Sequence, residues 1–201
     1  MTRDMEVVFV ADKSLSELAS LFECEIDDDD FYDVVAYNIS QADPDYLLRH
    51  IDRYTGSQLR GAVFGLGLSP TRNRAQETRL VALLGHSDPL VIAETLDALR
   101  HADYRDYWSD VSPLIQHESP FVRGAVIRYA RHVLVPEQAY SFLIAALGDA
   151  HAMVRSSAVD ELGDLGAKEA VSHIRLLLRD PDDDVREAAR TAINGLVRPR
   201  P

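Results

Sequence analysis

The sequence predicts an all-α solenoid of about five stacked helix pairs, preceded by a small strand–helix–strand cap. Two observations predict the solenoid: a short motif recurs with a period of 31 to 32 residues, and each copy is followed by apolar residues at helical spacing. One helix pair cannot bury its apolar face alone, whereas stacked pairs form a continuous core.

The repeated motif places a helix-capping type of residue five positions before a Val-Arg pair. Three segments carry it, His117–Arg123, Asp149–Arg155 and Asp180–Arg186, and weaker copies are His86–Ile92 and Tyr54–Arg60. The anchoring apolar residues are Leu59, Val91, Val122, Val154 and Val185, at spacings of 32, 31, 32 and 31. So regular a period indicates one structural unit per copy.

Each unit is predicted to contain two helices. After the anchor, apolar or small residues recur at offsets of 3, 4, 7 and 8, as in Ala188, Ala189, Ala192 and Ile193, which is the stripe of a helix buried on one face. The preceding helices are predicted over 45–54, 75–84, 104–116, 137–147 and 169–178. Second helices are predicted to begin at Asp88-Pro89, Ser119-Pro120 and Asp180-Pro181, where a capping side chain precedes proline.

The Asp-x-x-x-x-Val-Arg signatures at Asp149–Arg155 and Asp180–Arg186 resemble the HEAT repeat family, particularly its short variant in phycobilisome lyases. The resemblance covers about residues 42–198 and implies a right-handed solenoid, which we predict as a domain over residues 42–201. It leaves function open, because such repeats serve many roles.

Residues 1–41 do not follow the repeat and are predicted to form an acidic α/β cap. Strands are predicted over Val7–Val10 and Phe31–Ile39, and a helix over 14–22, where Ser14 and Glu17 form a capping box. The segment resembles the openings of bacterial toxin-immunity proteins.

The composition of the chain excludes some kinds of site and disfavours some kinds of partner. The single cysteine, Cys24, excludes an intramolecular disulfide and a cysteine-based zinc site. Neither a membrane span nor a signal peptide is predicted, so we expect a cytoplasmic protein. The net charge is −12, and residues 1–58 carry 4 Lys or Arg against 14 Asp or Glu. Such a surface repels phosphate backbones and attracts basic partners, so no nucleic-acid partner is expected.

Two groups of residues are the candidate partner-binding sites. The first is an acidic run with flanking aromatic and acidic residues, in which charge would accelerate association with a basic protein: Asp27, Asp28, Asp29, Asp30, Tyr32 and Asp33. The second is the aromatic cluster Tyr104, Tyr107 and Trp108, which is equally consistent with packing and with binding.

Other polar residues are assigned structural roles. Arg60, Arg123, Arg155 and Arg186 recur in the motif, which favours a structural ladder over a phosphate-binding one. The histidines His86, His117 and His151 lie on equivalent loops and are expected to be loop or capping residues rather than metal ligands. No catalytic residues, cofactor or metal are predicted.

The sequence therefore favours a non-catalytic protein-binding scaffold, in its specific form an immunity-type inhibitor of a basic partner. The alternatives are a phycobilin-lyase-like or other small-molecule-handling protein, suggested by the repeat resemblance, and a HEAT-class DNA glycosylase, which the acidic charge disfavours.

Overall fold

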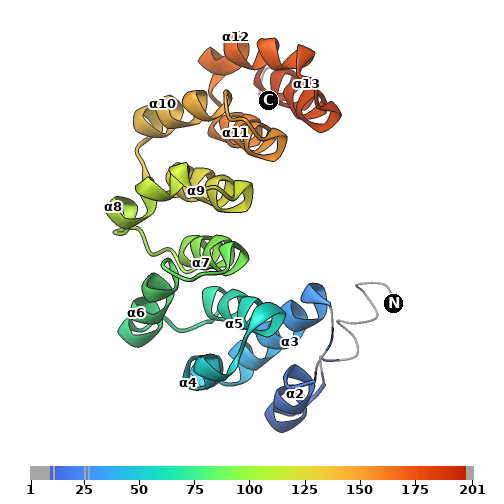
Figure 1. Ribbon diagram of the computed structural model, residues 1–201, viewed down its shortest axis with the longest axis vertical. Coiled ribbons are helices and arrows are strands. Elements are labelled where there is room, and N and C mark those ends of the chain that lie inside the picture. Colours follow the sequence, from blue (N-terminus) through green and yellow to red (C-terminus); the bar gives the residue numbers. More distant parts are fainter. Residues whose placement is uncertain (1–9, 11, 25, 27, 198–201) are drawn as a thin grey trace. The chain divides into compact units, whose positions relative to one another are not determined.

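The computed structural model describes residues 10, 12–24, 26 and 28–197, and it contains helices and no strands within them. The chain divides into two compact units, residues 1–104 and 105–201, which we call the first and second unit. Each unit contains three helix pairs in its described part (Figure 1).

The first unit pairs α2 with α3, α4 with α5, and α6 with α7. The bounds are α2 Leu15–Phe22, α3 Asp29–Ala42, α4 Tyr46–His50 continued by the 3-10 turn η1 Ile51–Arg53, α5 Gly56–Gly67, α6 Arg74–Leu83 and α7 Pro89–His101. The second helices α3, α5 and α7 pack side by side in that order.

The predicted strand over Phe31–Ile39 is wrong, because these residues lie within helix α3. The Asp28 side chain caps the helix by accepting a hydrogen bond from the backbone N–H of Phe31 at 3.2 Å. The buried residues Tyr32, Val35, Ala36, Ile39 and Ser40 follow the helical offsets of the other units. Burial of this stripe outweighs the β-propensity of the Val34-Val35 pair.

The rest of the predicted cap is partly confirmed. Ser14 and Glu17 form the capping box of α2, with the Glu17 carboxylate accepting from the Ser14 N–H at 2.8 Å. Of the predicted strand Val7–Val10, only Val10 is among the described residues, and it is helical. Where the structure describes it, the segment before residue 42 is therefore a helix pair and not an α/β cap.

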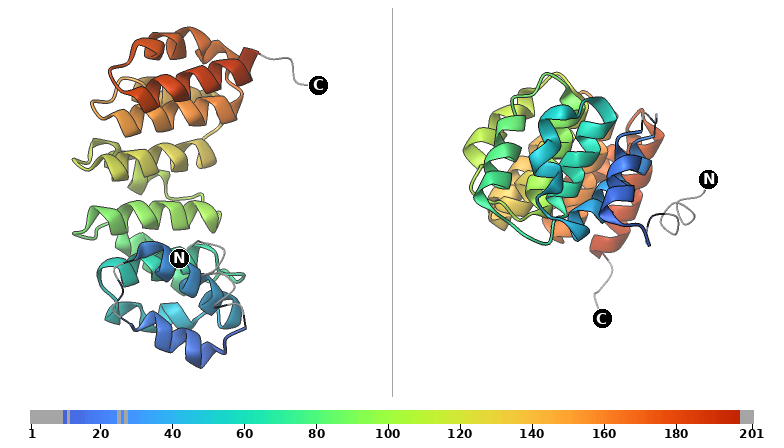
Figure 2. Two further views of the ribbon diagram at one scale, coloured as in Figure 1. Left: turned by 90° about the vertical axis from the view of Figure 1, so that its right-hand side faces the viewer. Right: turned by 90° about the horizontal axis from the view of Figure 1, so that it is seen from below.

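The second unit repeats the same arrangement. Its elements are α8 Trp108–Val111 with the 3-10 turn η2 Ser112–Gln116, α9 Pro120–Val133, α10 Pro136–Ala146, α11 Ala152–Leu165, the short segments η3 Lys168–Ala170, α12 Val171–Ile174 and η4 Arg175–Arg179, and α13 Asp183–Val197. Figure 2 shows α9, α11 and α13 stacked as successive layers of this unit.

Most predicted first helices are confirmed, but the one predicted over 104–116 begins later, at Trp108. Asp103 adopts a positive φ of 58°, so the chain turns after α7 and Tyr104 lies outside any helix. The second helices start at Pro89 and Pro120 as predicted, whereas α13 starts at Asp183. There Asp182 caps the helix by accepting from the N–H of Asp184 at 3.0 Å.

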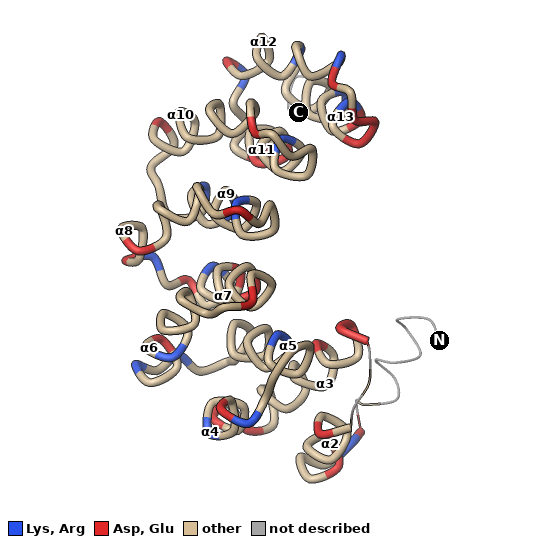
Figure 3. Tube along the Cα trace, viewed as in Figure 1, with Lys and Arg blue, Asp and Glu red and all other residues tan. Residues whose placement is uncertain are grey.

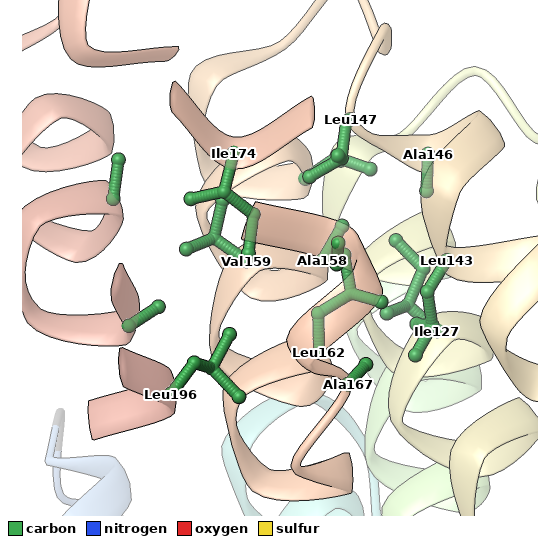
Figure 4. Packing of buried hydrophobic residues seen from close by; sticks show 14 residues of the cluster. Ile127, Leu143, Ala146, Leu147, Ala158, Val159, Leu162, Ala167, Ile174 and Leu196 are labelled. Carbon is green, nitrogen blue, oxygen red and sulfur yellow. The ribbon is translucent and has the colours of Figure 1, made fainter. Parts of the chain in front are cut away.

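All five predicted anchors are buried, which confirms the repeat. In the second unit, residues from consecutive pairs form one hydrophobic cluster, among them Leu147, Val159, Leu162, Ile174 and Leu196 (Figure 4). The core is thus continuous from one pair to the next.

Two buried tyrosines of the first unit differ in how their hydroxyl groups are satisfied. The Tyr32 hydroxyl donates to the Cys24 carbonyl at 2.6 Å and accepts from the Ile26 N–H at 3.0 Å. The Tyr54 hydroxyl is buried with no hydrogen-bond partner in the described part of the chain, and burial raises the pKa of Tyr54 to about 12.

We therefore expect opposite results from removing these two hydroxyl groups. Tyr32→Phe should lower the free energy of unfolding by about 1–2 kcal/mol, because two hydrogen bonds are lost. Tyr54→Phe should leave it unchanged or raise it, because a buried hydroxyl without a partner is removed. Urea unfolding followed by circular dichroism measures both, and equal losses in the two variants would contradict this account.

Candidate partner-binding surfaces

The recurrent arginines of the second unit form a structural ladder, as predicted. Arg123 binds Asp149 of the next pair in a bidentate manner, with Nε and Nη2 each 2.8 Å from a carboxylate oxygen. Arg155 binds Asp180 in the same way, at 2.8 and 2.6 Å. The remaining nitrogen of each guanidinium, Nη1, donates to two backbone carbonyls of the preceding loop. Each arginine thus ties its own loop to the next pair.

The two ends of the motif series deviate from this pattern. In the first unit Arg60 binds backward, to Asp29 at 2.6 Å, and only approaches Asp88 of the following pair at 3.9 Å. In the second unit Arg186 keeps the two carbonyl bonds, to Asp180 and Pro181, but its ion pair is with Asp183 of its own helix. The guanidinium groups of Arg60, Arg123 and Arg155 are engaged within the fold, which argues against a phosphate-binding ladder.

The ladder lowers the pKa of its carboxyl groups. Hydrogen bonding from Arg123 is the main reason that the pKa of Asp149 lies below its usual value, and Arg155 does the same for Asp180. These aspartates are more acidic in the folded than in the unfolded state. Their contribution to stability is therefore present above the unfolded pKa and lost as the pH falls through the folded pKa.

We expect the free energy of unfolding of the second unit to fall as the pH drops below about 4, the ordinary pKa of an Asp carboxyl. The single tryptophan, Trp108, lies in this unit and reports its unfolding by fluorescence. Urea titrations between pH 7 and pH 3 measure the effect. Asp149→Asn should reduce this pH dependence, and an unchanged dependence in that variant would refute the assignment.

The loop histidines bind backbone N–H groups, as predicted, but only His151 caps a helix, α11; His86 and His117 bind the residues that cap α7 and α9. The Nδ1 atoms of His86 and His117 each accept a backbone N–H two residues ahead at 3.0 Å, and that of His151 does so at 3.3 Å. No group of three or more His, Cys, Asp or Glu side chains suited to a metal ion occurs among the described residues.

The acidic run lies at the start of α3, as the acidic colouring in Figure 3 shows. Asp28, Asp29 and Asp30 are all exposed, but Asp29 is bound by Arg60, which is the main cause of its lowered pKa. Asp33 is half-buried. Asp27 lies outside the described residues. The run therefore offers two exposed carboxylates without an arginine partner, Asp28, which also caps α3, and Asp30, whereas Asp29 is held by Arg60.

Tyr32, predicted as a surface anchor beside the acidic run, lies instead in the core. Its side chain is 2% exposed and packs edge-on against Phe22, with ring centroids 5.4 Å apart. The helical register of α3 explains the correction, because Tyr32 is the first residue of the buried stripe.

The aromatic cluster is divided between the two units. Tyr104 closes the first unit, where its hydroxyl donates to the Asn73 carbonyl at 3.4 Å, and burial is the main cause of its raised pKa. Tyr107 and Trp108 lie near the start of the second unit, and both are half-buried. These three residues therefore do not share a helix face.

Trp108 packs against a residue that the sequence pattern did not single out. Its ring meets that of Phe142 edge-on, with centroids 5.2 Å apart. Phe142 also lines an open groove of about 560 Å³ in the second unit, together with Ile115, Glu118 and Arg123. The lining of the groove combines apolar and charged side chains. Phe142 and Ile115 come from different helix pairs, so only the stacking reveals this surface.

Comparisons with known proteins agree with this architecture. Residues 132–194 match a family profile described as HEAT repeats. None of the curated proteins matches the sequence significantly. No helix among the described residues is long and apolar enough to cross a membrane.

Two solved structures share the fold. An engineered protein from a structural genomics programme is 15% identical, with a TM-score of 0.55, over 98% of this chain and 97% of its own. A designed armadillo repeat protein in complex with the peptide (KR)4 is 15% identical, with a TM-score of 0.53, over 92% of this chain and 100% of its own. This likeness establishes a fold of stacked helical repeats.

Proposed function

We propose that this chain is a non-catalytic scaffold that binds a basic segment of another protein through the start of α3. In its specific form the chain is an inhibitor of immunity type, which occupies the basic surface of its target. The observation that carries the proposal is the pair of exposed carboxylates at Asp28 and Asp30.

The ion pairs of the first unit support this choice of surface. Several of its acidic residues are engaged by arginine within the unit, as in Asp29–Arg60, Asp43–Arg49 and Asp52–Arg79. For Asp28 and Asp30, the described part of the chain provides no Lys or Arg partner. A basic ligand therefore meets two carboxylates that need not first release an internal cation.

A second line of support comes from the fold. The designed armadillo protein that shares it was solved with the peptide (KR)4, which is basic. Stacked helical repeats provide long rigid surfaces that bind extended segments with little reorganisation. The acidic balance of residues 1–58 makes a basic segment the fitting ligand class for this chain.

The test is binding of a fluorescein-labelled (KR)4 peptide, measured by anisotropy at 50 and 200 mM salt. We expect saturable binding, weakened at least tenfold in Asp28→Asn/Asp30→Asn. The matched control is Glu137→Gln/Glu169→Gln, which removes the same charge from two exposed residues of the second unit. We expect it to change the affinity less than threefold.

Equal weakening in both variants would show that the peptide senses only net charge, and the proposed site would be withdrawn. Absence of binding by the wild type at 50 mM salt would remove the basic-ligand proposal itself. In either case circular dichroism of the variants excludes unfolding as the cause.

A further inference from the structure

The last helix pair consists of α12, η4 and α13. Its outer face exposes side chains at positions whose counterparts in the preceding pair are buried. Leu147 of the α10/α11 pair is 8% exposed, whereas Leu178, at the same position of the last pair, is 37% exposed. Leu162 is fully buried, whereas its counterpart Ile193 is only half-buried. The difference arises because α13 covers α11, while α13 itself is packed only by α11 and by α12 and η4 of its own pair among the elements of residues 105–197 (Figure 1).

The arginine of this pair is held in the same way as its predecessor. Arg186 Nη1 donates to two loop carbonyls at 2.7 and 3.0 Å, as Arg155 Nη1 does at 3.0 and 3.1 Å. The Nε–Nη2 edge of Arg155 binds the carboxylate of the following pair. In Arg186 this edge meets only Asp183, whose side chain is 90% exposed, so the described residues leave it without the bidentate partner.

Apolar and charged side chains both occur on this face. Val197 is 62% exposed and lies one turn beyond Ile193, on the same side of α13. Arg190 stands where α11 has the buried Val159, and it pairs with Glu187 at 2.9 Å on the surface. Such a mixture is typical of a reversible interface, whereas a permanently buried core is uniformly apolar.

We propose that this face, formed by Leu178, Arg186, Ile193 and Val197, binds the same face of a second copy of the chain in a two-fold dimer. The face is self-complementary, because Asp183 lies one turn before Arg186 on the same side of α13 and forms an ion pair with it. A two-fold axis therefore brings a carboxylate of one copy opposite the guanidinium group of Arg186 in the other copy. The same axis brings the apolar residues of the two copies opposite each other. The described residues at the other end of the chain offer no apolar match, since α2 exposes Ser16, Glu17 and Ser20.

The test is sedimentation velocity of the full chain over a hundredfold range of concentration. We expect a monomer–dimer equilibrium, with the dissociation constant raised at least tenfold by Val197→Lys and by Arg186→Gln. Val135→Lys is the matched control, because Val135 is an exposed valine elsewhere in the same unit, 54% exposed against 62% for Val197. It should leave the equilibrium unchanged.

Three outcomes would overturn the proposal. These are a monomer at every concentration, a dimer that Val197→Lys and Arg186→Gln leave intact, and open assemblies larger than a dimer. The last outcome would indicate head-to-tail association instead of a closed two-fold contact. Val197 is exposed and Arg186 is half-buried, so circular dichroism is used to establish that both variants fold.

Discussion

Asp180→Ala is expected to lower the free energy of unfolding of the second unit by about 2–4 kcal/mol. The Asp180 side chain is 4% exposed and that of Arg155 is 12% exposed, so the ion pair is largely screened from water. Removing the carboxylate leaves a mostly buried guanidinium with two unpaired N–H groups. It also deletes the acceptor for the Asp182 N–H, which lies 3.0 Å away in the loop before α13.

The measurement is urea unfolding followed by Trp108 fluorescence. The control is Arg190→Gln, which breaks an exposed pair with Glu187 and should cost no more than about 0.5 kcal/mol. Adding Arg155→Met to Asp180→Ala should recover part of the loss, because the unpaired charge is then absent. A cost below about 1 kcal/mol for Asp180→Ala would mean that the ladder contributes little to stability.

Gly65→Ala is expected to lower the free energy of unfolding of the first unit by about 1–3 kcal/mol through overpacking. A Cβ atom at this position of α5 would lie 2.5 Å from Leu47 Cδ1 and 2.9 Å from the Ala36 carbonyl oxygen. The leucine side chain can rotate away, but the backbone of α3 cannot move without separating the two helices. The glycine thus sets how closely α3 and α5 pack.

Gly195→Ala is the matched control, since a Cβ at this position of α13 would have no atom within 4 Å. Alanine is the better helix former, so this variant should be as stable as the wild type or more stable by up to about 1 kcal/mol. Urea unfolding followed by circular dichroism compares the two. Equal stability of both variants would show that the α3–α5 contact adjusts to the added methyl group without cost.

The two largest predicted effects differ in how visible their causes are in the sequence. The ladder arginines occupy a fixed position of the repeat, so a structural role could be predicted for Arg123 and Arg155. Their acceptors Asp149 and Asp180 belong to the next copy of the motif, and only stacking brings them within hydrogen-bond distance. For Gly65, nothing in the sequence pattern reveals the close approach of Ala36.

The candidate sites show the same division. The charge of the acidic run could be predicted from the sequence, and Asp28 and Asp30 are exposed as expected. Composition alone could not decide whether the Tyr32 side chain is buried or exposed. It follows from the register of α3, in which Tyr32, Val35 and Ala36 are buried on one face.

By itself the sequence determined the repeat, the second helices after the anchors and the excess of acid near the start of the chain. Each of these depends on local spacing or on composition. Only the tertiary structure decided that Phe31–Ile39 is helical. Tyr32 precedes Leu59 by 27 residues, shorter than the period of 31 to 32, and the segment's β-branched and aromatic residues favour a strand locally. Packing of the buried stripe of α3 against α5 outweighs that preference, because burial of several side chains contributes more free energy than intrinsic propensity does.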